Sequence, residues 1–126
     1  MKKTIFAENG PKPIAPYSPA VEANGFVFVS GQVGSDPATG KLVDGGISAQ
    51  TDQALRNLRS ILAAAGLDLA DAVKVTVFLS DIGNFAAMNE VYRQYFTTDC
   101  PARSAFQVGA LPGGAAVEIE AIAAAK

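Results

Sequence analysis

The chain has 126 residues, 49% hydrophobic and 17% charged, which fits one domain with a modest core and excludes a disordered chain. A formal net charge of -2 without a cationic stripe makes nucleic acid an unfavoured partner. Because no run of about 18 apolar residues occurs, we expect a cytoplasmic protein without a membrane span.

The first half of the chain predicts a β-hairpin followed by a long helix. Residues 25–31 are β-branched and aromatic, which indicates a strand, and the Asn24-Gly25 turn makes Val21-Glu22 its expected hairpin partner. Apolar residues then recur at helical spacing over 47–62, and Gly66 provides the left-handed residue that ends a helix.

The second half predicts a strand, a second helix and two further strands. Residues 73–79 form the strand, and the aromatic residues of 85–96 mark one side of an amphipathic helix. Residues 103–108 and 117–123 indicate two strands joined by a turn over 111–114. This order predicts an α+β fold in which both helices cover one face of a sheet, so the other face needs a further partner.

Four short stretches carry a more specific signal, because in this order and spacing they resemble the hallmarks of the RidA/YjgF family. The stretches are Ala15-Pro16-Tyr17-Ser18-Pro19-Ala20, Val29-Ser30-Gly31-Gln32, Pro101-Ala102-Arg103-Ser104 and Val117-Glu118-Ile119-Glu120-Ala121-Ile122-Ala123. Residues 57–58, 64–67 and 73–79 are also similar to the family. The resemblance therefore covers essentially the whole chain.

The resemblance implies a chorismate-mutase-like fold with a mixed sheet, as a single domain over 1–126. It implies a homotrimer whose sheets surround a central barrel and whose active sites lie between subunits. It further implies a 2-iminobutanoate/2-iminopropanoate deaminase-like hydrolase that converts enamines and imines, such as 2-aminoacrylate, to 2-oxo acids without cofactor or metal. The composition agrees, because the chain has no histidine and Cys100 is its one cysteine, which excludes His-based nucleophilic pairs and the usual metal-ligand sets.

Arg103 and Glu118 are the main candidate catalytic residues. Hydrolysis of an imine beside a carboxylate needs a group that holds the carboxylate and a base that activates water. Arg103 is the candidate clamp, because a guanidinium grips a carboxylate through two parallel hydrogen bonds; the alternative is an ordinary salt bridge. Glu118 matches the family glutamate that activates water, whereas Glu120 lies on the same strand face, and only the motif separates the two.

Four further residues complete the expected site. Tyr17 is a catalytic candidate in a proline-flanked loop, where its hydroxyl can contact ligand, and Gly31 matches the position whose backbone N–H approaches the substrate. Asn89 resembles a helix residue that lines the cleft from a neighbouring subunit. Many bacterial relatives carry cysteine where Ala105 stands, so thiol chemistry is not expected and Ala105 offers its backbone N–H to the substrate.

The separation of Arg103 from Glu118 is a difficulty for a site within one chain. A simple hairpin through 111–114 displaces them by several residues, on the order of 10 Å at about 3.3 Å per residue. Either the arginine reaches back along its strand, or a bulge shifts the register, or the site combines residues of different subunits.

Two other functions stay open beside the deaminase. A non-catalytic binding or regulatory protein would use the Arg103 clamp to sense a 2-oxo acid. An RNA-directed nuclease or translation inhibitor, an activity of some relatives, is disfavoured by the acidic balance and the absence of histidine. The sequence also leaves open whether 2-aminoacrylate or 3-aminoacrylate is the substrate.

Overall fold

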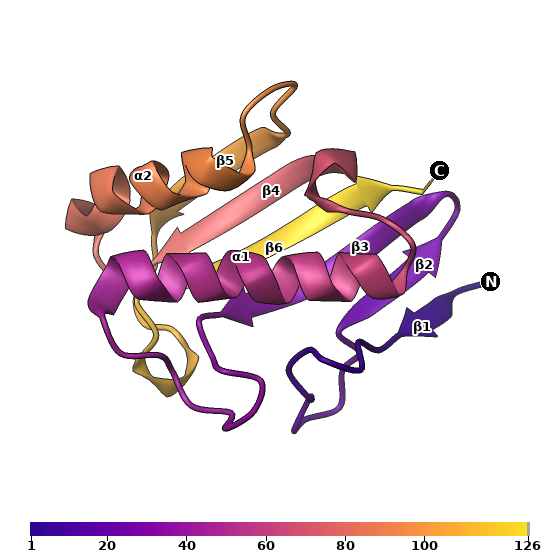
Figure 1. Cartoon of the computed structure of the whole chain (residues 1–126), viewed down its shortest axis with the longest axis horizontal. Helices are drawn as coiled ribbons and strands as arrows, with labels where there is room; N and C mark the ends of the chain where they lie inside the picture. The colour runs from indigo at the N-terminus through magenta and orange to yellow at the C-terminus, as the bar shows by residue number, and fades with distance from the viewer. Residues whose placement is uncertain (126) are drawn as a thin grey trace.

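The computed structural model describes residues 1–125, which form a mixed six-stranded sheet with two α-helices on one side of it (Figure 1). The elements are β1 (Lys3–Ile5), β2 (Ala20–Ala23), β3 (Phe26–Val33), α1 (Gly46–Ala64), β4 (Ala72–Leu79), α2 (Phe85–Tyr95), β5 (Ala102–Gln107) and β6 (Val117–Ala124). Short 3₁₀ turns span Leu69–Asp71, Ile82–Asn84 and Pro112–Gly114. The last residue of the expected domain, Lys126, lies outside the described residues.

The helices and strands expected from the sequence are present, and β1 is additional. The β2–β3 hairpin turns at Asn24 and Gly25, whose φ angles of 52° and 81° fit the type I′ turn that joins closely paired strands. Helix α1 ends shortly before Gly66, which has a φ of 76°. Strand β1 was not predicted, because only Ile5 of its three residues is buried and so short a segment shows too little alternation of apolar and polar residues.

The expected hairpin between the last two strands is wrong. The sheet order is β1-β2-β3-β6-β4-β5, so β4 lies between β5 and β6, parallel to β5 and antiparallel to β6. The apolar content of the strands explains this order. β4 and β6 each have a fully buried side, which suits the centre of the sheet, whereas the β5 residues are half-buried or exposed, which suits an edge.

The two faces of the sheet differ in what covers them. On the helix side, Val75, Val77 and Ile119 are fully buried in a core that they share with buried leucine and isoleucine side chains of α1. The opposite face, here called the open face, carries aromatic side chains that stay 42–45% exposed, namely Phe26, Phe28 and Phe106. Exposed apolar side chains gathered on one sheet face are typical of an interaction surface.

Candidate active site

Glu118 lies on the open face of β6, half-buried, with its carboxylate against the backbone of Gly31 on β3. A Cβ atom at position 31 would come within 2.8 Å of the Glu118 Cδ atom, which is closer than any carbon contact allows. Only glycine therefore leaves room for the carboxylate in this position. This contact joins two of the residues expected in the site.

A β-bulge in β3 creates the space beside Glu118. The register advances from Val29 opposite Ala121 to Gln32 opposite Ile119, so β3 holds one residue more than β6 over this interval. The extra residue keeps both Val29 and Gln32 buried on the helix side. It leaves Gly31 on the open face, next to Glu118.

The loop that carries Tyr17 is fastened to this bulge. The Ser30 hydroxyl donates a hydrogen bond to the Ser18 carbonyl at 2.7 Å, and the Ser30 N–H donates to the Pro19 carbonyl at 2.9 Å. Tyr17, Gly31 and Glu118 consequently line one cavity of about 1090 Å³. The structure brings these three expected residues together.

The Glu118 carboxyl group has a raised pKa. Burial is the main cause, because it removes water from the charged form, and the nearby negative charge of Glu120 adds to the effect. A glutamate whose pKa moves toward neutrality is better suited to accept and return a proton than an ordinary surface carboxylate. Glu120, on the same face, is exposed.

Polar side chains of α1 hold the backbone around Glu118 in place. The Gln50 side-chain carbonyl accepts a hydrogen bond at 2.8 Å from the N–H of Ala116, at the entry to β6. The buried Asn57 amide donates to the Val33 and Ser35 carbonyls at 3.2 and 2.9 Å, where β3 ends. These bonds fix both strands that meet at the carboxylate.

Arg103 stands in a different environment, on the helix side of the edge strand β5. Its Nη1 atom donates to the Asn89 side-chain oxygen at 2.7 Å, and its guanidinium lies over the rings of Tyr92 and Phe85 on α2. Arg103 and Asn89 line a second, shallower cavity of about 570 Å³ together with Cys100. The structure thus brings Arg103 and Asn89 together.

Arg103 and Glu118 do not meet within one chain, because they point to opposite faces of the sheet. Arg103 on β5 lies beside Val75 on the neighbouring strand β4, and Val75 is fully buried on the helix side. Glu118 pairs with Phe78, which faces the open side. The expected site is therefore divided into two parts, a base half with Tyr17 and Gly31 and an arginine half with Asn89.

The chain matches one known protein family over almost its whole length. Residues 7–125 match the family described as Endoribonuclease L-PSP. The chain belongs to this family. The resemblance expected from the four sequence stretches is thereby confirmed.

Individual relatives and solved structures are similar to nearly the whole chain. A RutC family protein of Pyrococcus horikoshii is 54% identical over 98% of both chains. A Bos taurus protein named 2-iminobutanoate/2-iminopropanoate deaminase is 50% identical over 98% of this chain and 90% of its own length. The crystal structure of Escherichia coli TdcF with bound serine has a TM-score of 0.93 and 39% identity, covering 98% of this chain and 99% of that one. The expectation of a deaminase-like enzyme is confirmed by the curated relatives, and the fold with helices on one sheet face by the solved structure.

Ala105 lies on β5, half-buried against the core on the same side as Arg103. Within residues 1–125, no group of three or more His, Cys, Asp or Glu side chains is placed to hold a metal ion. None of the helices described is long and apolar enough to cross a membrane.

Sequence reasoning missed Ser30, Gln50 and Asn57 as residues that position the base half. Ser30 lies within a stretch that carried the family resemblance, and this position could have indicated its role in holding the Tyr17 loop by hydrogen bonds. The polar Gln50 and Asn57 interrupt the apolar side of α1, with Asn57 only 1% exposed, and a buried amide needs hydrogen-bond partners. That interruption was the available signal.

Proposed function

We propose that this chain is a cofactor-free hydrolytic deaminase that converts enamine and imine intermediates of the 2-aminoacrylate and 2-iminopropanoate class to 2-oxo acids and ammonia. The observation that carries the proposal is the Glu118 carboxylate, half-buried with a raised pKa against Gly31. The deaminase name of the bovine relative and the amino acid bound to the TdcF structure support a small substrate that bears a carboxylate.

In the proposed reaction Arg103 binds the substrate carboxylate and orients the imine carbon. Glu118 takes a proton from water as the water oxygen forms a bond to that carbon, and the C=N electron pair moves onto nitrogen. Glu118 then returns the proton to the amino group. The C–N bond breaks, the hydroxyl proton is released and the carbonyl forms, so an iminium and water give a 2-oxo acid and ammonium.

We further propose that the site is assembled between copies of the chain in a homotrimer around a central barrel. Side chains that reach along their strands stay on their own sheet face, so neither a reaching arginine nor a bulge joins Arg103 to Glu118 within one chain. An interface that sets the base half of one copy against the arginine half of the next is heterologous, and such an interface forms a ring when the rotation between neighbouring copies closes, as it does after three copies in a trimer. The exposed Phe26, Phe28 and Phe106 of the open face support its burial in that ring.

The proposal is tested by measuring ammonia release from freshly generated 2-iminopropanoate, with binding of pyruvate followed by calorimetry. The wild type should accelerate ammonia release, and Glu118→Gln should lose about 10²–10⁴-fold in turnover while it still binds pyruvate. Glu120→Gln is the matched control and should remain active. A wild-type protein that binds pyruvate without accelerating ammonia release would instead be a 2-oxo acid sensor.

A further inference from the structure

One side of helix α2 encloses the Arg103 guanidinium. Phe85, Asn89 and Tyr92 recur at one-turn spacing, so their side chains stand in one row that faces β5. The guanidinium carbon lies 4.6 Å from the Tyr92 ring centroid and 5.6 Å from that of Phe85, and Asn89 accepts its hydrogen bond at 2.7 Å. Both rings are within the range of cation–π attraction.

Tyr92 is itself firmly held. It is only 7% exposed and stacks on Phe96 with ring centroids 4.5 Å apart. Its hydroxyl has no hydrogen-bond partner among the described residues, and burial raises the pKa of Tyr92 to about 12, so the phenol stays neutral. The contact that Tyr92 offers to Arg103 is therefore its ring face rather than its oxygen.

The rings of Tyr92 and Phe85 contact Arg103 without neutralising its charge, as a carboxylate partner would. A carboxylate beside Arg103 would neutralise the guanidinium and occupy its paired N–H donors. Within residues 1–125, no Asp or Glu forms an ion pair with Arg103. The rings hold the plane of the guanidinium while leaving its positive charge and most of its donors for another anion.

We propose that Tyr92 is a positioning residue whose ring, with Phe85 as a second wall, fixes the Arg103 guanidinium for binding the substrate carboxylate. This inference rests on the proposed function, since it deepens the role of Arg103 as the clamp. The occupant of the remaining donors is then the carboxylate of a 2-imino or 2-oxo acid.

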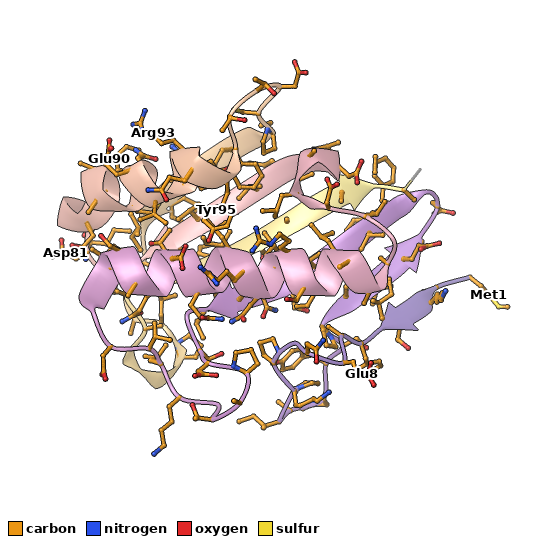
Figure 2. All side chains as sticks on the ribbon, in the orientation of Figure 1. Met1, Glu8, Asp81, Glu90, Arg93 and Tyr95 are labelled. Carbon is orange, nitrogen blue, oxygen red and sulfur yellow. The ribbon has the colours of Figure 1, made fainter. Side chains whose placement is uncertain are left out.

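The test compares pyruvate affinity and kcat/KM in Tyr92→Leu and Tyr92→Phe. Tyr92→Leu removes the ring and should weaken pyruvate binding about 10-fold, whereas Tyr92→Phe should recover the affinity because it keeps the ring. The matched control is Tyr95→Leu on the same helix. Tyr95 lies between α1 and α2 (Figure 2), where its hydroxyl donates a hydrogen bond to Asp52 and its ring contacts Arg59 rather than Arg103. This control should therefore bind pyruvate like the wild type.

A double variant separates positioning from general stability. In an Arg103→Ala background, Tyr92→Leu should cause no further loss of kcat/KM, because the group that it positions is gone. A purely structural role would lower kcat/KM in both backgrounds and would overturn the inference. If Tyr92→Leu does not fold, Phe85→Leu takes its place, because Phe85 is half-buried and forms the second wall. Its expected loss of pyruvate affinity is about 3-fold.

The failure of this inference is distinguishable from the failure of the proposed function. If Arg103→Ala binds pyruvate like the wild type, the clamp itself is wrong and the inference falls with it. If Arg103→Ala loses binding while Tyr92→Leu and Phe85→Leu both bind normally, the clamp stands and the aromatic positioning is wrong.

Discussion

Replacing Gly31 by alanine should lower activity about 10²-fold without unfolding the protein. The new Cβ would lie 2.8 Å from Glu118 Cδ and 3.0 Å from Cγ, against an ordinary contact of 3.4–4 Å. The carboxylate must therefore move by on the order of 1 Å, a displacement of a reacting group that costs about 10²-fold in rate. Because a flexible side chain yields and alanine lowers the entropy of the unfolded chain, the free energy of unfolding should change by less than about 1 kcal/mol.

Gly34→Ala is the matched control for this prediction. Its Cβ would lie 2.6 Å from the Cα and carbonyl oxygen of Gln50, and a helix backbone cannot turn aside as a side chain does. This variant should lose about 1–3 kcal/mol of unfolding free energy, while its folded fraction keeps turnover. The readouts are ammonia release per folded enzyme and thermal unfolding.

Two results would refute the reasoning about Gly31. The first is wild-type turnover in Gly31→Ala, which would mean that the position of the Glu118 carboxylate does not matter. The second would come from the double variant Gly31→Ala with Glu118→Gln. If the glycine acts through the Glu118 carboxylate, this double variant should be no slower than Glu118→Gln alone. An additive loss would show that the methyl group acts elsewhere.

Three further predictions concern charge and cofactor requirements. Arg103→Ala should lose roughly 2–5 kcal/mol of pyruvate binding free energy, and Arg103→Lys should recover only part of it because a point charge does not reproduce the planar fork; calorimetry measures both. The acid limb of the pH profile of kcat/KM should lie above the ordinary glutamate pKa, because Glu118 must ionise to act as base. Glu120→Gln removes a nearby negative charge and should move this limb to lower pH. A limb that does not move would contradict the assignment of Glu118 as the base. Turnover should survive dialysis against chelators and the change Cys100→Ser, whereas loss of activity restored by a divalent metal would overturn the mechanism.

The pKa of Glu118 also has a consequence for stability. Since the folded state raises this pKa, it binds the proton more tightly than the unfolded chain does. The stabilising contribution is full below the unfolded pKa and is lost as the pH rises through the folded one. Activity and this contribution to stability therefore change in opposite directions over the same pH range.

The helices and strands other than β1 could be predicted because each of them has its own local signal. The Asn24-Gly25 turn and the alternation around Glu118 and Glu120 depend on neighbours in the sequence, and the structure confirms both. The pairing of β5 with β4 is a contact between strands separated by a helix. Sequence proximity favoured a hairpin with β6 instead, and the burial that places β4 and β6 in the centre appears only when all strands compete for positions.

The candidate site was predictable as a set of residues but not as an arrangement. The motifs indicated Arg103 and Glu118, yet the face to which each points depends on the register of both strands against β4. The close approach of Glu118 to Gly31 depends on a bulge, which a single residue inserted in β3 produces without any distinctive local pattern. The aromatic enclosure of Arg103 joins α2 to β5 and likewise becomes visible only in three dimensions.

The central claim is that each active site takes Glu118 from one copy of the chain and Arg103 from the next. Mixing equal amounts of the strongly impaired Arg103→Ala and Glu118→Gln subunits tests it directly, after unfolding and joint refolding. With random assembly about one quarter of the sites would contain neither substitution, so ammonia release should return to about a quarter of the wild-type rate. Mixed oligomers, verified by native mass spectrometry, that remain as inactive as the parent variants would contradict the shared site.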